Sequence, residues 1–200
     1  MMTMRFFAIG SWTEGMLHFE KLKNFIVSYE TASIAGSVYR LPVGFPVYLD
    51  QGEDEVLGQL IELKVDQTLV GLMDSFHGVH FVDAAKGLHQ RIQKTVKKMS
   101  GQLEQAQVYI FNPKKLSKKA QLIAGGSWQD SLALNPPVTA QLTEKQVGYI
   151  LKLGAVKGRD IVPINDLSLY RELMKLELIV DKGRRLALSS LGKEVYNHLV

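Results

Sequence analysis

Residues 31–63 read TASIAGSVYRLPVGFPVYLDQGEDEVLGQLIEL, and this stretch carries the clearest structural pattern of the chain. Its segments 31–41, 45–49 and 56–63 are rich in β-branched and aromatic residues, which favour strands. The clusters PVGFP and DQGEDE between them contain the Gly, Pro and acidic residues that are typical of turns. The stretch therefore predicts three consecutive strands separated by turns.

The β pattern continues on both sides of this stretch. Residues 4–12, MRFFAIGSW, predict a short buried strand that runs into a Gly-Ser turn, and segments 92–99 and 105–111 predict two later strands. Apolar residues have helical spacing over residues 14–26 and again over 66–79, where a glycine is expected to stop the helix. Many strands and few helices predict an α+β domain with a curved or closed sheet.

The composition is that of a chain able to bury a core, since 46% of its 200 residues are hydrophobic. The absence of cysteine excludes disulfides, thiolate catalysis and cysteine-ligated zinc. No apolar stretch approaches the roughly 20 residues that a membrane span needs, and residues 1–12 lack the apolar block of a signal peptide. The GxxxxGK[ST], GxGxxG and GxSxG patterns do not occur. We expect a cytoplasmic protein with no cofactor and no membrane association.

The net charge of +4 is unevenly distributed. Residues 1–87 carry 6 Lys/Arg and 11 Asp/Glu, whereas residues 88–120 carry 8 Lys/Arg and a single acid. An acidic half followed by a basic segment is one signature of an anionic partner. The alternative is that the lysines of KTVKK and KKLSKK are solvated surface residues, which keep proteins soluble.

Eight short patterns punctuate residues 4–131. They are Ala8-Ile9-Gly10-Ser11, Gly36-Ser37-Val38-Tyr39, Gly44-Phe45-Pro46, Val56-Leu57-Gly58-Gln59-Leu60, Met73-Asp74-Ser75-Phe76-His77-Gly78, His89-Gln90-Arg91, Ala106-Gln107-Val108-Tyr109-Ile110-Phe111 and Gly126-Ser127-Trp128. In their order and spacing they resemble the γ-glutamylcyclotransferase-like family. The resemblance implies a mixed β-barrel domain with few helices over residues 1–131.

The resemblance also implies a reaction, in which the α-amine of a γ-glutamyl group attacks its own γ-carbonyl and releases 5-oxoproline. The family's Tyr-Gly-Ser loop anchors the substrate through backbone N–H groups, and here Gly10 is kept while Ile9 replaces the tyrosine. His89 replaces a second tyrosine of the family. The residues expected to bind a substrate or ligand are Ile9, Gly10, Ser11, Trp12, Phe45, Pro46, His89 and Arg91.

The family's catalytic glutamate is replaced by His77. A carboxylate there would act as general base and then general acid, whereas a neutral imidazole accepts a proton but gives no negative charge to attract an ammonium group. Asp74 matches a structural aspartate of the family, and neither Glu62 nor Asp83 aligns with the base. Three readings stay open: a working base, a binding pocket without cyclotransferase activity, and a structural histidine.

A metal site is a further alternative, because His77 and His80 are three residues apart, with Asp83 and His89 beyond them. The expected helix end at Gly78 would separate the two histidines, and no HExxH pattern accompanies them. We therefore expect no metal.

The chain changes character after residue 131. Residues 132–141 contain two prolines and predict an extended linker. From residue 142 the pattern is helical, with a capping start at Thr143, a second helix capped by Asn165 or Asp166, a short hairpin and a terminal helix. This ending resembles winged-helix domains, which implies a small α+β domain over residues 142–200.

Three roles are open for this second domain. The hairpin tip offers Lys182, Arg184 and Arg185 to a nucleic-acid backbone or to a protein partner. The link over residues 155–164 shows no clear additional helix, and the second helix mixes basic and acidic residues, which disfavours DNA reading. Self-association, a protein partner, or docking onto the first domain are the alternatives.

Two classes of function follow. The first is a non-cyclising binding module, whose pocket takes a small γ-glutamyl-like or anionic ligand and whose C-terminal domain acts as an adaptor. The second is an atypical, active γ-glutamylcyclotransferase that uses His77 as general base. A ligand-responsive DNA-binding protein is a further alternative. The histidine at the glutamate position leads us to expect the binding module rather than an enzyme.

Overall fold

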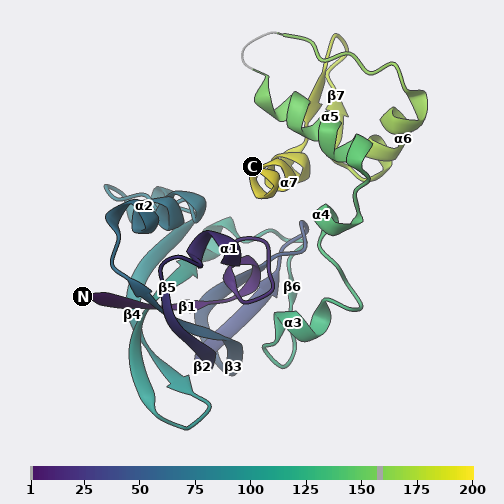
Figure 1. Ribbon diagram of the computed structural model, residues 1–200. Coiled ribbons are helices and arrows are strands. Elements are labelled where there is room, and N and C mark those ends of the chain that lie inside the picture. The colour runs from purple at the N-terminus through teal and green to yellow at the C-terminus, as the bar shows by residue number, and fades with distance from the viewer. Residues whose placement is uncertain (1, 157–159) are drawn as a thin grey trace. The chain divides into compact units, whose positions relative to one another are not determined.

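Five strands close into a β-barrel in the computed structural model, which describes residues 2–156 and 160–200 (Figure 1). They are β1 (Thr3–Ala8), β2 (Ile26–Arg40), β3 (Pro46–Lys64), β4 (His89–Lys98) and β5 (Leu103–Phe111). The hydrogen-bonded order is β3-β1-β5-β4-β2, and β2 pairs with β3 to close the ring. The pairing of β1 with β5 is parallel and the others are antiparallel. A sixth strand of two residues, β6 (Gln121–Leu122), pairs with the end of β2.

The expected segments 45–49 and 56–63 form one strand, β3, instead of two strands separated by a turn. The acidic cluster between them is a bulge: Ser37 pairs with Leu49 and Gly36 pairs with Asp54, so residues 50–53 are extra on the β3 side. Extra residues on one strand increase its bend and twist, which a closed barrel needs. The turn-like composition thus correctly indicates an irregularity, but the expectation that the strand ends there is wrong.

Adjacent residues of each strand alternate between two cores, because successive side chains of a strand point to opposite faces. The barrel interior receives Phe7, Leu60 and Val108 together with residues of β2 and β4. Their neighbours Phe6, Ile61 and Tyr109 point outward, against the helices. These parts of β1, β3 and β5 are thus buried on both faces, whereas β4 and the first residues of β2 are largely exposed.

The main helix that covers the outer face is α2 (Gln67–Phe76), which packs Leu69, Val70 and Met73 against the barrel (Figure 1). Asp66 caps it by accepting a hydrogen bond from the backbone N–H of Leu69. The helix ends where Gly78 adopts a positive φ of 61°, so the expected stop is confirmed.

The other helical pieces of this unit are short: η1 (Gly10–Trp12), α1 (Phe19–Leu22), η2 (Ala84–Lys86), η3 (Pro113–Lys115) and α3 (Trp128–Ser131). The helix expected over residues 14–26 is thereby reduced to α1. Its apolar spacing is real, since Leu22 and Phe19 pack on the outer core, but residues 23–26 already lead into β2.

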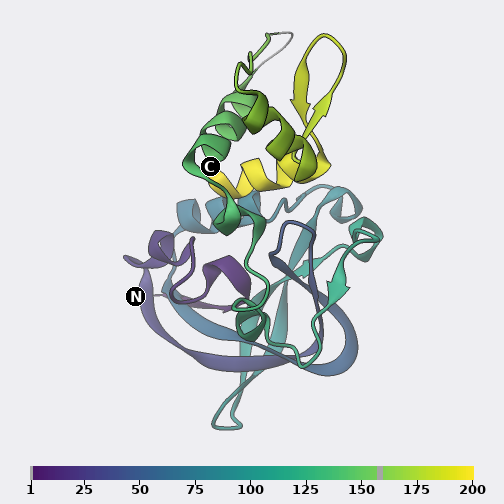
Figure 2. The same ribbon diagram turned by 90° about the vertical axis from the view of Figure 1, so that its right-hand side faces the viewer.

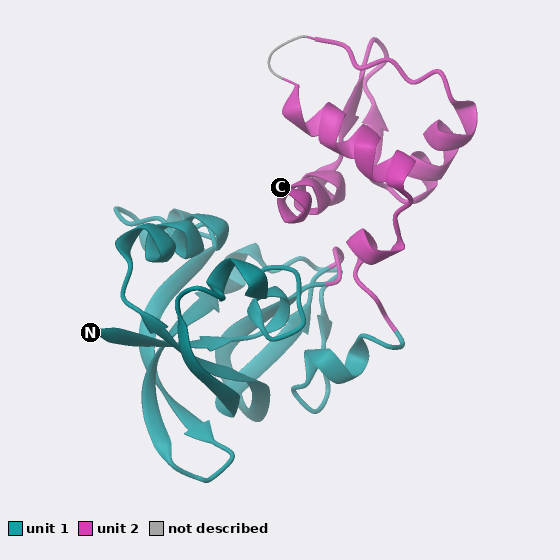
Figure 3. Cartoon of the chain, viewed as in Figure 1, with its two compact units in different colours: residues 1–41, 45–134 teal, residues 42–44, 135–200 magenta. Residues whose placement is uncertain are grey.

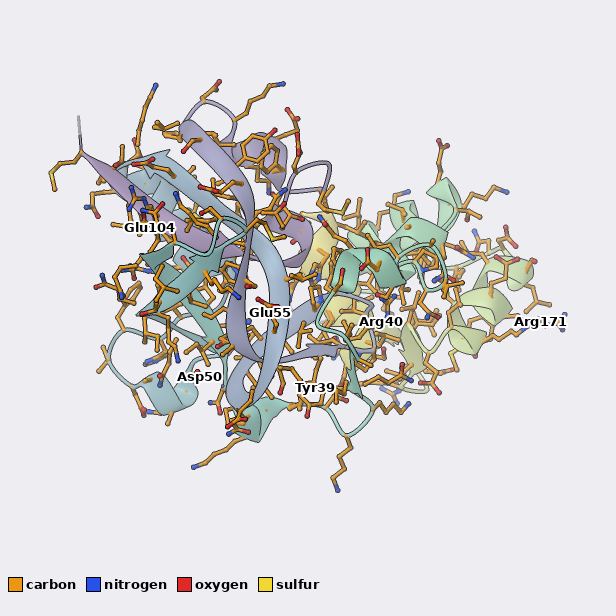
Figure 4. The ribbon with its side chains drawn as sticks, turned by 90° about the horizontal axis from the view of Figure 1, so that it is seen from below. Tyr39, Arg40, Asp50, Glu55, Glu104 and Arg171 are labelled. Carbon is orange, nitrogen blue, oxygen red and sulfur yellow. The ribbon has the colours of Figure 1, made fainter. Side chains whose placement is uncertain are left out.

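The acidic and basic segments of the sequence meet on the barrel. Lys94 pairs with Asp50 of the bulge, and Lys97 lies 3.6 Å from Glu55. Lys98 reaches Glu30 at 2.9 Å and Glu104 at 3.8 Å. Figure 4 labels three of these acids, Asp50, Glu55 and Glu104, along the strands. These β4 lysines are thus part of ion pairs within the unit, whereas the lysines of residues 114–119 are exposed.

The chain divides into two compact units: residues 1–41 and 45–134, and residues 42–44 and 135–200 (Figure 3). The second unit contains α4 (Val138–Gln141), α5 (Glu144–Ala155), α6 (Leu167–Lys175), β7 (Ile179–Asp181), β8 (Leu186–Leu188) and α7 (Ser190–Leu199). The last four residues of the expected extended linker are therefore helical. The tip of the β2–β3 connection belongs to this unit because the Val138 N–H donates to the Val43 carbonyl.

Local sequence signals of the second unit are confirmed. Thr143 and Gln146 form a complete capping box at α5, and Asp166 caps α6. In the link expected to lack a helix, residues 160–164 are not helical, and residues 157–159 lie outside the described residues. The core consists of the buried side chains of Ile150, Leu153, Leu173, Leu178, Ile179 and Val195. No helix in the described ranges is long and apolar enough to cross a membrane.

Candidate functional site

The end of α2 places His77 at the margin of the outer core. Its backbone N–H donates to the Met73 carbonyl at 3.0 Å, and its ring Nδ1 lies 2.8 Å from the same oxygen. A carbonyl only accepts, so Nδ1 carries the proton. In the neutral ring, Nε2 is therefore the basic nitrogen.

Rings surround this imidazole. Tyr109 stacks on it with ring centroids 3.7 Å apart and planes 1° apart. Trp12 lies nearly parallel at 6.1 Å, while His89 meets it edge-on at 5.1 Å. Two of the expected ligand-binding residues, Trp12 and His89, are thus brought to His77, and Tyr109 joins them.

Asp74, about one turn earlier in α2, accepts hydrogen bonds at both carboxylate oxygens. Its buried carboxylate accepts from Arg91 Nε at 2.7 Å and Nη2 at 3.1 Å, and from the Tyr109 hydroxyl at 2.9 Å. These hydrogen bonds raise the pKa of Arg91, while burial and then the charge of Asp74 raise the pKa of Tyr109. Arg91, which was expected to bind a ligand, is held by Asp74 and Gln107. The group fixes α2 and the Tyr109 ring under His77.

His89 is neutral in this setting. Burial lowers its pKa to about 4, against a smaller opposite effect of the hydrogen bond to the His77 carbonyl. That bond joins its Nδ1 to the carbonyl oxygen at 2.7 Å, so Nδ1 donates. His89 therefore ties the start of β4 to the end of α2 and brings no charge beside His77 at neutral pH.

The turn expected to cradle a ligand, residues 9–12, is rigid. Gly10 has a φ of +70°, and a Cβ there would lie 2.6 Å from Pro46 Cγ, so glycine is required twice over. The Thr13 hydroxyl donates to the Gly10 carbonyl at 2.7 Å, and Gln129 Nε2 donates to the Thr13 hydroxyl at 3.1 Å. Ser11 and Trp12 are buried. The turn thus positions the Trp12 ring beside His77.

A cavity of about 150 Å³ opens near this turn. Two stretches expected from the family patterns line it, Ile9-Gly10 and Gly58-Gln59, and the α3 residues 128–130 form another wall. Thr13, Thr31, Leu57 and Ser127 complete the lining. Neither His77 nor Trp12 is among its lining residues, so the structure describes a cavity and a histidine cluster that share the turn at Gly10.

The remaining expected residues lie apart from this cluster. Phe45 packs against Trp128 at 6.0 Å between ring centroids, and Pro46 contacts Gly10. The hairpin turn of the second unit carries Lys182, Arg184 and Arg185, which are exposed.

The two alternative acids are engaged elsewhere. Glu62 accepts from the Thr3 hydroxyl at 2.7 Å, and Asp83 accepts from the Ala85 N–H at 3.1 Å. Within the described residues no group of three His, Asp or Glu side chains has the arrangement of a metal site.

Sequence reasoning missed several residues that the fold brings to the site. Tyr109 is named above only within a family pattern, and Thr13, Gln129 and Asp130 are absent from the expected site. No local pattern identifies the last two as cavity residues, because α3 reaches the Gly10 turn only through the tertiary fold. Gly58 and Gln59 belong to one of the family patterns, which is a sequence signal that could have placed them among the expected site residues.

Comparisons with solved structures find similar chains at low identity. The chain is similar to YkqA of Bacillus subtilis, with 19% identity, a TM-score of 0.49 and coverage of 66% of this chain; it spans 42% of that protein's chain. It is similar to an AIG2-like protein of Mus musculus, with 15% identity, a TM-score of 0.45, and coverage of 58% of this chain and 86% of that one. It is also similar to an uncharacterized protein from Pyrococcus horikoshii, with 14% identity and a TM-score of 0.43. The match covers 66% of this chain and 93% of that one.

No curated protein sequence matches the chain. The profile of one family does: gamma-glutamyl cyclotransferase, AIG2-like, matches residues 6–130, which is more than half of the chain and spans the barrel from β1 to α3. The chain belongs to the gamma-glutamyl cyclotransferase, AIG2-like family.

Proposed function

We propose that this family member binds a small γ-glutamyl-like ligand without cyclising it. The observation that carries the proposal is the imidazole of His77, fixed by Met73 and Tyr109, at the position where the family resemblance implies a catalytic glutamate. Cyclisation needs a group that takes a proton from the substrate's ammonium and returns one to the leaving amine. A neutral imidazole lacks the negative charge that would attract the ammonium.

The engagement of neighbouring acids supports this proposal. Asp74 is three residues away, but its two oxygens accept from Arg91 and Tyr109, and its loss would remove the carboxylate partner of the half-buried Arg91 guanidinium. Because both oxygens of Asp74 already accept hydrogen bonds, this carboxylate is a poor substitute for the missing base.

The cavity beside Gly10 is our candidate for the ligand site. A cavity of about 150 Å³ is large enough for a ring of six carbon atoms. The described lining has amide, hydroxyl and carboxylate side chains from Gln59, Thr13 and Asp130, and it contains no Lys, Arg or His. A ligand with both donors and acceptors fits this lining better than a simple anion, which favours the γ-glutamyl-like class.

Retained cyclotransferase activity with His77 as general base is the alternative. The hydrogen bond of Nδ1 to Met73 supports it, because it fixes Nε2 as the nitrogen that could accept a proton. The neutral state of His89 adds to this, since no neighbouring positive imidazole would oppose protonation of His77.

Calorimetric titration with γ-glutamyl dipeptides, followed by assay of the same samples for 5-oxoproline, tests the proposal. We expect heat of binding and no 5-oxoproline. Gln59→Leu should weaken binding, because it removes an amide from the cavity lining, whereas His80→Ala, an exposed histidine outside the cavity, should not. Turnover that His77→Ala abolishes would establish the alternative, and absence of binding would remove the ligand proposal.

For the second unit we propose a winged-helix-like adaptor over residues 142–200, joined to the barrel domain (1–131) by residues 132–141. The order of two helices, a β-hairpin and a terminal helix supports this assignment. In α6, Glu172 accepts from Gln146 and from Ser168, so its acidic side chain is built into the helix pair. An acid at this position disfavours DNA contact through α6, and we favour a protein partner or self-association.

A further inference from the structure

Two neighbouring loops on the first unit form a basic surface with an apolar tip, which we call the loop patch. It consists of residues 79–88, between α2 and β4, and residues 112–119, after β5 (Figure 2). Asn112 joins the loops, since its side-chain amide donates to the Ala85 carbonyl at 3.1 Å and to the Gly87 carbonyl at 3.2 Å. Lys115 also donates to the Lys86 carbonyl. The two loops are therefore one surface.

The apolar tip is held in an exposed position. Phe81 and Val82 expose 77% and 94% of their surface. They lie in a turn that is closed by a hydrogen bond, which the Asp83 N–H donates to His80 Nδ1 at 2.9 Å. Two adjacent large apolar side chains at the end of a fixed turn bring no benefit to the folded unit itself.

The two loops that form the patch are rich in lysine. The loop patch contains five lysines, at positions 86, 114, 115, 118 and 119, and all are exposed. Its single acid is Asp83, whose carboxylate already lies 3.4 Å from Lys86 and accepts from the Ala85 N–H.

An anionic lipid surface is a suitable partner for both the lysines and the apolar tip of the loop patch. Lysines near such a surface are attracted to its headgroups, and apolar side chains gain by entering the acyl boundary. Single-stranded nucleic acid fits less well, because bases stack on aromatic rings and the more exposed of the two tip residues is a valine.

We propose that the loop patch docks this protein on the surface of anionic membranes, with Phe81 and Val82 entering the headgroup region. The contact is with one leaflet and needs no spanning helix. It departs from the sequence expectation of no membrane association, because that expectation considered spanning segments and signal peptides, and the two loops become one surface only in the fold.

Flotation of the full chain with phosphatidylcholine vesicles, with and without phosphatidylserine, tests the proposal. We expect binding only to the anionic vesicles and release by high salt. Lys114→Glu with Lys118→Glu should lower the partition coefficient about 30-fold, at roughly fivefold per lysine. Phe81→Ser with Val82→Ser should lower it by more than about tenfold. Met99→Ser, at an exposed apolar residue of the β4–β5 turn, is the matched control and should bind like the parent.

Phe81→Trp gives a second readout that does not depend on affinity alone. Both native tryptophans, Trp12 and Trp128, are buried, so the new indole would be the exposed fluorophore. Its emission should shift to the blue on addition of anionic vesicles and be quenched by brominated lipid. No binding to anionic vesicles, equal binding by the Phe81→Ser/Val82→Ser variant, or an unshifted indole would overturn the proposal. Binding of a single-stranded oligonucleotide in place of vesicles would also overturn it.

Discussion

At the scale of single residues, three positions of one helix end have separate tasks. Asp74 holds Arg91 and Tyr109, and the ring of Tyr109 in turn supports His77. The histidine takes its orientation from the Met73 carbonyl. A change at position 77 therefore alters the imidazole itself, whereas a change at position 74 alters the contacts that support it.

Asp74→Asn should lower the free energy of unfolding by about 3 kcal/mol, because it removes the charged partner of Arg91 in a pair whose carboxylate is 3% exposed. Urea denaturation measures the change. The control is Glu20→Gln in the exposed pair with Lys23, where we expect a change within about 0.5 kcal/mol. Equal small effects of both substitutions would show that the Asp74 pair has no supporting role.

The stability of the protein should fall as the pH is lowered through the range set by His89. Its pKa is about 4 in the fold and 6.5 when unperturbed, so the unfolded chain binds the proton first. Stability is therefore complete above pH 6.5 and is lost progressively down to about pH 4, by up to about 3 kcal/mol.

The measurement is the free energy of unfolding against pH for the parent and for His89→Phe. Burial also lowers the pKa of His198, so both proteins keep the pH dependence that comes from that residue. The difference between the two curves isolates His89. Parallel curves from pH 7 to pH 4 would contradict the assignment.

At the scale of elements, β1 and β3 approach each other closely beside the cavity. Gly58 of β3 faces Ala8 at the end of β1, and a Cβ at position 58 would meet the Ala8 carbonyl oxygen and the ring of Phe7. Ala8 leads directly into the Gly10 turn, and Gly58 itself lines the cavity. The close packing at Gly58 therefore affects both the pairing of β1 with β3 and the wall of the cavity.

Gly58→Ala should destabilise the protein by at least about 2 kcal/mol, because the added methyl group forces two strands apart. Gly71→Ala in α2 is its matched control, since nothing lies within 4 Å of a Cβ there. That substitution should stabilise the protein by about 0.5–1 kcal/mol through helix propensity. Thermal unfolding of both variants gives the comparison, and a tolerated Gly58→Ala would show that β1 and β3 can separate freely.

The same scale shows what the sequence could predict. Strands 31–41 and 105–111, the end of the second helix at Gly78, and the capping box at Thr143 follow from local propensity and were confirmed. The bulge at residues 50–53 and the short α1 depend on barrel closure, which local composition does not encode. Likewise, the stack of Tyr109 on His77 joins residues far apart in the chain, so no spacing rule would identify it.

At the scale of the whole molecule, the chain combines a family barrel with a second unit of different architecture. The expected basic segment also divides in two: the β4 lysines pair with acids of the barrel, and the later lysines stay on the loop patch. The first group of lysines makes ion pairs within the barrel unit, and the second group carries the membrane contact that we propose.

Charge reversal in the hairpin of the second unit should leave duplex DNA binding unchanged at a low, nonspecific level. The variant combines Lys182→Glu, Arg184→Glu and Arg185→Glu, which remove the exposed cations of the β7–β8 turn. Fluorescence anisotropy with labelled duplexes measures it. Tight binding by the parent at physiological salt that the variant loses would favour the DNA-binding alternative over the adaptor.

We propose that position 77 lacks the family's catalytic carboxylate while the protein still accepts γ-glutamyl compounds. The most direct measurement is 5-oxoproline release from γ-glutamyl dipeptides by the parent protein and by His77→Glu, side by side. The account predicts a silent parent and measurable release by His77→Glu. Release by the parent that is lost in His77→Glu would contradict it and would assign the imidazole as the working base.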